Sequence, residues 1–152
     1  MAHEFKMKRR VEFADTDMAG IAHFSNFFRW MEATEHAFLR SLGFTLHEND
    51  QDGMRGWARV HADCDYKRPL RYPDEFEVRL LVRGVHESSI EYAFAFVQAE
   101  SEVARGALEV VYVARRAGEE SMRRTPIPHA IAAAIEVAPS QSLQTRGGRI
   151  AR

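Results

Sequence analysis

The length, composition and charge of this chain fit one ordinary globular domain. Its 152 residues suit a single domain, and 45% apolar and 28% charged residues are usual values for a folded protein. The formal net charge of −1 gives no electrostatic basis for binding nucleic acid or an anionic membrane. The sequence has no secretory signal and no apolar run of the roughly 18 residues that a membrane span needs, so we expect a cytoplasmic protein.

The first third of the chain predicts a strand, a turn and a helix. Residues 5–14 have strand character, and residues 15–20 are typical of a turn because they combine Asp side chains with a glycine. A helix is expected over about residues 26–41, with Ser25 as its N-cap and Gly43 as the glycine that ends it. Apolar residues occupy more than one face of this segment, which predicts a mostly buried helix.

A polar segment, residues 44–56, predicts a loop, after which apolar and polar residues alternate with a period of two. Four half-buried strands follow from this alternation, and those from residue 74 onward should form an antiparallel meander. The predicted inward residues of the first strand are Ala58, Val60, Ala62 and Cys64. Those of the three later strands are Phe76, Val78, Leu80 and Val82, then Ile90, Tyr92, Phe94 and Phe96, then Leu108, Val110 and Tyr112.

The C-terminal part of the sequence has a different character. Residues 129–137 predict a short helix, and residues 138–152 are polar and contain glycine, so we expect a disordered tail that is dispensable for activity. The predicted domain is therefore residues 1–137, an α+β fold in which one helix packs on an antiparallel sheet of about five strands.

The single cysteine, Cys64, excludes an intramolecular disulfide and is predicted to be a small buried residue. No His or Cys cluster has the spacing of a metal site, and no G-x-S-x-G elbow indicates an α/β-hydrolase.

One motif makes the chain recognisable. Residues 11–21, Val-Glu-Phe-Ala-Asp-Thr-Asp-Met-Ala-Gly-Ile, are followed by Asn26-Phe27 and by Glu32 on the predicted helix. This arrangement resembles the opening of the 4-hydroxybenzoyl-CoA and acyl-CoA thioesterase family, whose pattern is D-x-D-x-x-G followed by N-[YF] and an acidic helix residue. The resemblance spans about residues 5–116. It implies the hotdog fold, a long central helix wrapped by a curved antiparallel sheet, which agrees with the layout above.

The resemblance also implies a reaction and its residues. It makes the second Asp of the motif, Asp17, the catalytic carboxylate, as base or nucleophile, and the backbone N–H near Phe24 the oxyanion donor. Both roles make chemical sense, because thioester hydrolysis needs an activated nucleophile and a stabilised oxyanion, and a helix N-terminus offers free N–H groups. No metal or organic cofactor is implied. The family's active site lies between protomers, so a homodimer or homotetramer is expected.

Further candidates surround this motif. His23 stands one position before the family's His, and it either orients substrate and shuttles a proton or packs against the helix start. Glu32, a carboxylate on a predicted buried helix, should line the site or bond to its floor, and Glu35 is its backup on the same face. If Asp17 proves inert, Glu32 or Glu35 is the next candidate. Asn26 is expected to fix the junction between loop and helix.

The phosphates of CoA require cations. Family members often carry basic residues at the turn between the second and third strands of the sheet, where this sequence has Arg83 and His86 beside Glu87. The alternative cations are Lys67, Arg68 and Arg71, which flank Pro69.

The sequence therefore predicts hydrolysis of an acyl-CoA or acyl-carrier-protein thioester to a free acid and a thiol. Two rivals remain: a non-catalytic acyl-CoA-binding protein of the same fold, and a hotdog dehydratase or hydratase.

Overall fold

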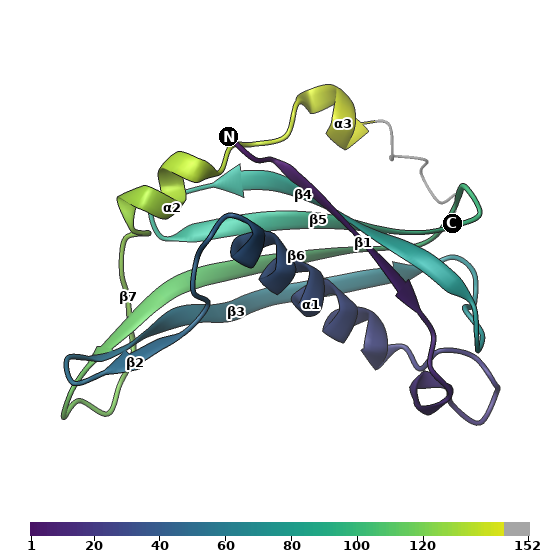
Figure 1. Ribbon diagram of the computed structural model, residues 1–152, viewed down its shortest axis with the longest axis horizontal. Helices are drawn as coiled ribbons and strands as arrows, with labels where there is room; N and C mark the ends of the chain where they lie inside the picture. The colour runs from purple at the N-terminus through teal and green to yellow at the C-terminus, as the bar shows by residue number, and fades with distance from the viewer. Residues whose placement is uncertain (145–152) are drawn as a thin grey trace.

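A computed structural model describes residues 1–144 of the chain (Figure 1). The elements in chain order are β1 (Glu4–Arg10), the 3-10 turn η1 (Phe13–Asp15), α1 (Ser25–Ser41), β2 (Glu48–Asp50), β3 (Gly53–Tyr66), β4 (Glu75–Val85), β5 (Ser89–Gln98), β6 (Ser101–Arg116), β7 (Arg123–Arg124), α2 (His129–Ala134) and α3 (Ser140–Gln144).

The strands form one antiparallel sheet in the order β1-β4-β5-β6-β3-β2, with β7 paired to β6. The predicted α+β class and the meander β4-β5-β6 are confirmed. The expected number of about five strands is wrong, because the sheet has seven strands within residues 1–144. The two unpredicted strands, β2 and β7, have three and two residues, which is too short for a period of two to be read.

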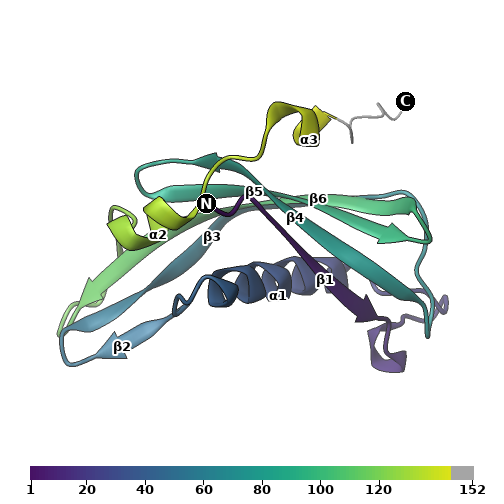
Figure 2. The same cartoon turned by 45° about the horizontal axis from the view of Figure 1, so that its top comes forward.

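Helix α1 lies in the hollow of the sheet. Figure 2 shows the sheet arching over α1, while α3 lies on the opposite side of the sheet. Aromatic side chains fill the space between helix and sheet: Phe27 contacts Phe96 with ring centroids 5.0 Å apart, and Trp30 contacts Phe76 at 4.7 Å. Only 8 of the 17 residues of α1 are buried, and their spacing places them on one face, so the prediction of a mostly buried helix is wrong.

The two ends of α1 differ in how well the sequence predicted them. Gly43 has a φ of +86°, and its N–H bonds to the carbonyl of Arg40 while the Phe44 N–H bonds to that of Leu39. This pair of bonds is a Schellman motif, so the predicted C-terminal glycine is confirmed. The predicted N-cap is wrong: Phe24 is the N-cap residue, without a side-chain cap, and Ser25 is the first helical residue.

Strand β3 departs from its predicted alternation because of a β-bulge between Arg59 and His61. Before the bulge Arg59 pairs with the buried Val110, and after it Ala62 pairs with Leu108. The extra residue reverses which positions face α1. Residues predicted to point inward therefore do so only after the bulge, and Val60 is 55% exposed.

The segment after β7 returns to the start of the chain. Ile135 forms a parallel bridge with Ala2, and the N–H of the buried Ala138 bonds to the carbonyl of Val82 at 2.8 Å. Helix α3 then occupies residues 140–144, where a disordered tail was expected. Ala138 is buried, and Leu143 of α3 lines a small cavity together with Leu81 of β4 and Phe94 of β5. The remaining tail positions, 145–152, lie outside the described residues.

In residues 1–144, α1 and the shorter helices all lack the length and apolar character that crossing a bilayer requires.

Candidate active site

The D-x-D loop is folded around its own carboxylates. Asp17 Oδ1 accepts a hydrogen bond from the N–H of Ala19 at 2.8 Å, and the Asp17 N–H donates to the Ile21 carbonyl at 2.8 Å. Gly20, with a φ of +78°, closes the turn by donating its N–H to the Asp17 carbonyl. Asp17 Oδ2 has no hydrogen bond to residues 1–144, so half of this carboxylate stays available.

Asp15 holds the loop in place. Its side chain accepts the N–H of Glu12 at 2.8 Å, and its carbonyl accepts bonds from the His23 N–H at 2.8 Å and from Asn26 Nδ2 at 2.7 Å. The buried Asn26 thus ties the first turn of α1 to the loop. This is the junction that the sequence predicted for Asn26, although a direct role in the reaction is untested.

Phe24 presents a free backbone donor at the start of α1. No acceptor among residues 1–144 bonds its N–H, whereas its carbonyl accepts the Tyr66 hydroxyl at 3.0 Å. An unpaired N–H at a helix N-terminus sits at the positive end of the helix dipole. The geometry here can therefore bind an anionic or partly anionic oxygen.

The Asp17 loop, the start of α1 and the β3–β4 loop enclose an open cleft of about 630 Å³. The side chains that line it are mostly apolar or cationic, and Asp17 is the acidic one. The lining residues are Asp17, Ala19, Ile21, Ala22, Phe24, Phe27, Tyr66, Lys67, Arg68, Pro69, Leu70 and Arg71. Asp17 and Phe24, 7 positions apart in the sequence, are thus brought to one cleft.

The other predicted site residues do not line this cleft. His23 is exposed, bonds through Nδ1 to Ser25 Oγ at 2.8 Å and stacks on Phe24 with ring centroids 4.6 Å apart. Arg83 and His86 both contact Glu91, at 3.5 Å and 3.0 Å, at the far end of β4. Glu91 is therefore an acidic partner of both side chains that were expected to bind CoA.

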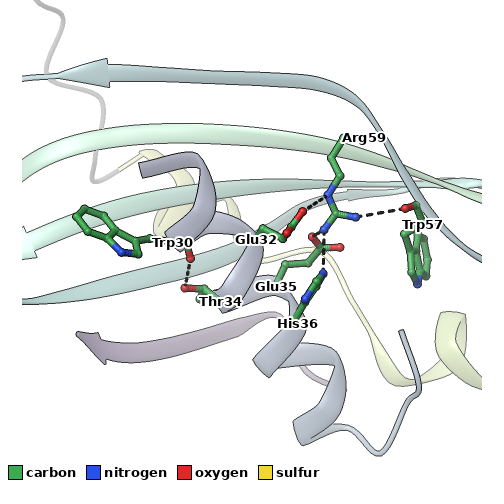
Figure 3. Close-up of polar contacts among 7 residues, drawn as sticks. All are labelled: Trp30, Glu32, Thr34, Glu35, His36, Trp57 and Arg59. Carbon is green, nitrogen blue, oxygen red and sulfur yellow. Dashed lines mark hydrogen bonds and ion pairs between the residues drawn. The ribbon is translucent and has the colours of Figure 1, made fainter. Parts of the chain in front are cut away.

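Glu32 belongs to a second polar cluster, farther along α1 (Figure 3). Its Oε2 lies 3.2 Å from Nε of Arg59, a β3 residue that the alternation of inward Ala58 and Val60 would place on the outward face. The same guanidinium forms an ion pair with Glu35, lies 3.2 Å from Nε2 of His36 and donates to the Trp57 carbonyl. Arg59 was missed because the bulge changes the strand's phase. The sequence signal that could have identified Arg59 is an arginine in a strand that packs against a helix carrying Glu32 and Glu35.

Glu35 is the most unusual residue of this second cluster. Its side chain is 0% exposed, and its Oε1 has no partner within residues 1–144. Burial raises the pKa of Glu35 to about 7, with Arg59 acting in the opposite direction and Glu32 in the same one. Burial, then Arg59, lowers the pKa of His36.

Tyr92 of β5 adds another unsatisfied group. Its buried hydroxyl also lacks a partner among residues 1–144, and burial, reinforced by Glu35, raises the tyrosine's pKa. Cys64 is half-buried, and burial raises the pKa of its thiol to about 11, which disfavours a thiolate. In the part of the chain that the structure describes, no three His, Cys, Asp or Glu residues form a metal-binding group.

Comparison with known proteins identifies the family. Residues 11–135 match the family model of the thioesterase-like superfamily, so the chain belongs to this superfamily. A protein of Aquifex aeolicus (strain VF5) whose name assigns it to the esterases is 37% identical over 100 residues, which are 66% of this chain and 76% of the relative.

Two solved structures agree. Slr0204, a 1,4-dihydroxy-2-naphthoyl-CoA thioesterase from Synechocystis, is 26% identical and covers 86% of this chain and 94% of its own, with a TM-score of 0.75. The 4-hydroxybenzoyl-CoA thioesterase from Pseudomonas sp. strain CBS-3 is 17% identical and shares the fold, with a TM-score of 0.75. The match covers 88% of this chain and 99% of the thioesterase. The predicted family and enzyme class, a thioesterase, are confirmed.

Proposed function

We propose that the chain hydrolyses an aromatic acyl-CoA thioester, with Asp17 as general base or nucleophile and the Phe24 N–H as oxyanion donor. One observation carries this proposal: Oδ2 of Asp17 and the N–H of Phe24 have no hydrogen-bond partner within residues 1–144, and both residues line the same cleft. The substrate carbonyl carbon would lie next to Asp17 while its oxygen points at the Phe24 N–H.

The reaction follows from these two groups. Asp17 either removes a proton from the attacking water or attacks the thioester carbonyl itself, and in each case the carbonyl oxygen gains negative charge. The Phe24 N–H and the dipole of α1 stabilise that charge more strongly than the neutral carbonyl, which lowers the barrier. The C–S bond then breaks, and the thiolate leaves and takes up a proton. Where Asp17 is the nucleophile, water hydrolyses the resulting anhydride.

The aromatic acyl group is supported by the cleft and by relatives. Phe24, Phe27 and Tyr66 give the cleft three aromatic rings, which suit a planar acyl group. A relative from Synechococcus sp. (strain WH7803), 29% identical over 134 residues, is named a 1,4-dihydroxy-2-naphthoyl-CoA hydrolase. A bulky aromatic thioester therefore heads the panel of substrates to be assayed, ahead of straight-chain acyl groups.

The remaining candidates take positioning roles in this proposal. Asn26 fixes the loop that carries Asp17 through its bond to the Asp15 carbonyl. His23 stacks against Phe24 and so orients the residue whose N–H binds the oxyanion. Glu32, with Arg59, lies outside the cleft of its own chain.

We also infer that two copies pair through β3, with α1 as the central helix of each hotdog unit. Within residues 1–144, β2 pairs only with positions 53–55 of β3, so the outer edge of β3 is open from Gly56 to Tyr66. An open edge of this length invites a second strand. The exposed Val60 lies on this edge, and Tyr66 belongs to the cleft, so pairing would bring the partner close to the site.

The substitution Asp17→Asn tests the chemistry. The amide keeps the side chain's shape but can act as neither base nor nucleophile, so kcat should fall at least about 100-fold. Hydrolysis is followed through the released thiol, and folding through the thermal midpoint. Asp52→Asn, on the exposed β2–β3 turn, is the matched control and should keep wild-type kcat. If Asp17→Asn retains more than about a tenth of wild-type kcat, the proposed role of Asp17 is wrong.

The substitution Val60→Glu tests the pairing. Two-fold symmetry brings the same strand from both copies together, so the new carboxylates should repel and shift the protein from dimer to monomer. Light scattering at micromolar concentration measures the mass. Val137→Glu, at another exposed valine, should leave the mass unchanged. A wild-type protein that is monomeric under these conditions contradicts the inference.

A further inference from the structure

We infer that Arg68 and Arg71 bind the phosphate groups of the phosphopantetheine arm that carries the acyl group. This inference rests on the proposed function and adds to it a subsite for the carrier end of the substrate. The two arginines belong to the loop between β3 and β4, and they line the same cleft as Asp17.

The arginine loop is joined directly to the catalytic loop. The N–H of Ala22 donates to the carbonyl of Leu70 at 2.7 Å, which links the segment after Asp17 to the residue between the two arginines. Leu70 is 0% exposed and belongs to the hydrophobic core. Because the core holds Leu70, its exposed neighbours on either side have fixed backbone positions beside the cleft.

Further bonds hold both ends of the loop. The N–H groups of Lys67 and Arg68 both donate to the carbonyl of Val103, at 2.9 Å and 3.0 Å. The N–H of Arg71 donates to the carboxylate of Asp74 at 2.9 Å, and the Asp74 carbonyl accepts the N–H of Val11 at 2.9 Å. The two guanidinium groups thus stand on a backbone that is already ordered, which reduces the entropy cost of binding.

The charges around the cleft favour an anionic ligand. Lys67 is engaged in an ion pair with Glu102, but neither Arg68 nor Arg71 has a carboxylate partner for its side chain in residues 1–144. The acid that lines the cleft is Asp17, which the reaction uses. Two unpaired guanidinium groups can each bind a phosphate through two N–H donors, a geometry that an ammonium group lacks.

The anion must be the part of the substrate that remains when the thioester sits at Asp17. In a CoA thioester, or in a thioester on a carrier protein, that part is a pantetheine chain ending in phosphate. The cations predicted earlier, Arg83 and His86, contact Glu91 instead and lie outside the cleft. The subsite on the β3–β4 loop therefore replaces the one expected after β4.

The test compares thioesters of one aromatic acid on three carriers: CoA, 4′-phosphopantetheine and phosphate-free pantetheine. For the CoA thioester, Arg68→Gln and Arg71→Gln should each raise KM about tenfold and leave kcat within twofold, because each removes one charge-assisted contact. With the pantetheine thioester, KM should not change. Arg124→Gln, at an exposed arginine on β7, is the matched control, and Arg71→Lys should restore part of the affinity.

Each outcome has a separate meaning. A KM increase for both phosphorylated carriers supports binding of the 4′-phosphate, and an increase for CoA alone supports contact with its nucleotide phosphates. Equal increases for all three carriers, or none, overturn the phosphate subsite while leaving the proposed hydrolysis intact. Failure of wild-type protein to hydrolyse any of the three thioesters overturns the proposed function and this inference together. An acyl-carrier-protein thioester, assayed with the same variants, distinguishes a protein-bound arm from free CoA.

Discussion

The loop before α1 and the middle of α1 both present a carboxylate beside polar groups, but in opposite environments. Asp17 lies in an open cleft, where one oxygen is held by the Ala19 N–H and the other has no partner in the described part of the chain. Glu35 is fully buried, paired with Arg59, and has an oxygen without a partner among residues 1–144. Open access and a nearby oxyanion donor suit the first carboxylate to chemistry. The second is buried and ion-paired with Arg59 of β3, which suits it to holding β3 against α1.

The comparison also shows that a perturbed ionisation does not by itself mark the reactive group. Burial raises the pKa of Glu35 to about 7, a value that would suit a general base. Glu35 nevertheless does not line the cleft that contains Asp17 and the free N–H of Phe24. Access to substrate and a correctly placed oxyanion donor therefore favour Asp17 as the reactive carboxylate. Substitutions at the two carboxylates should have different effects on activity and on stability.

The largest effect is expected from Arg59→Met. Removing the guanidinium leaves Glu35 buried without its partner, and breaking such a pair typically costs about 3–5 kcal/mol of unfolding free energy. Urea denaturation at pH 8 measures the loss. The double variant Arg59→Met with Glu35→Leu should recover most of it, because an apolar pair of similar volume removes the buried charge altogether. A double variant no more stable than Arg59→Met would contradict a structural role for the pair. Asp17→Asn, in contrast, should abolish turnover with little change in stability.

The next largest effect is expected in how the unfolding free energy depends on pH. The ordinary pKa of a glutamate, 4.5, applies to Glu35 in the unfolded chain, whereas its pKa in the folded protein is about 7. Below 4.5 both states hold the proton. Between these values only the folded state holds it, so the contribution of Glu35 to stability falls as pH rises, by about 1.4 kcal/mol per unit, and levels off above the folded pKa. Glu35→Gln cannot titrate and should lack this fall.

The measurement is the difference in unfolding free energy between wild type and Glu35→Gln across this pH range. The variant should gain about 2–3 kcal/mol relative to wild type between pH 4.5 and 7.5. The other charged or titratable groups that face Glu35 are Arg59, Glu32, His36 and Tyr92. They are present in both proteins, so their contributions to the pH dependence largely cancel in the difference. Parallel stability curves would mean that Glu35 is ionised throughout, held charged by Arg59.

How far the sequence predicted these two regions depends on how local each one is. The Asp17 loop and the start of α1 are adjacent in sequence, so one motif placed the carboxylate and the donor together. The Glu35 cluster joins α1 to a strand residue 24 positions away, and its geometry depends on the bulge after Arg59. An alternating pattern predicts a strand but does not report an inserted residue, and so Arg59 was assigned to the wrong face.

The same limit applies to the edges of the sheet. Alternation in residues 58–65 correctly predicted a strand, yet Val60, which lies at the bulge, and Ala62, which follows it, are both exposed. A period of two in the sequence shows that successive side chains point to opposite faces of the strand. It does not show which other element packs against each face. The cations of the β3–β4 loop were placed among the candidates, but only the fold brings them to the cleft of Asp17.

The smallest effect is expected from shortening the C-terminal segment, whose helix α3 lies on the other side of the sheet from α1 (Figure 2). Truncation after Val137 removes the buried Ala138, its bond to the Val82 carbonyl and the contacts of Leu143, which lines a small cavity with Leu81. One hydrogen bond and a partly buried leucine should together cost about 1–2 kcal/mol of stability. Neither kcat nor the pH dependence due to Glu35 should change, because both carboxylates lie on the other face of the sheet.

Truncation after Gln144 removes only residues 145–152 and should leave stability, kcat and KM at wild-type values. If this shorter truncation instead raises KM for a CoA thioester and not for a pantetheine thioester, then Arg146, Arg149 and Arg152 contribute to nucleotide binding, and the phosphate subsite is larger than the two arginines of the β3–β4 loop.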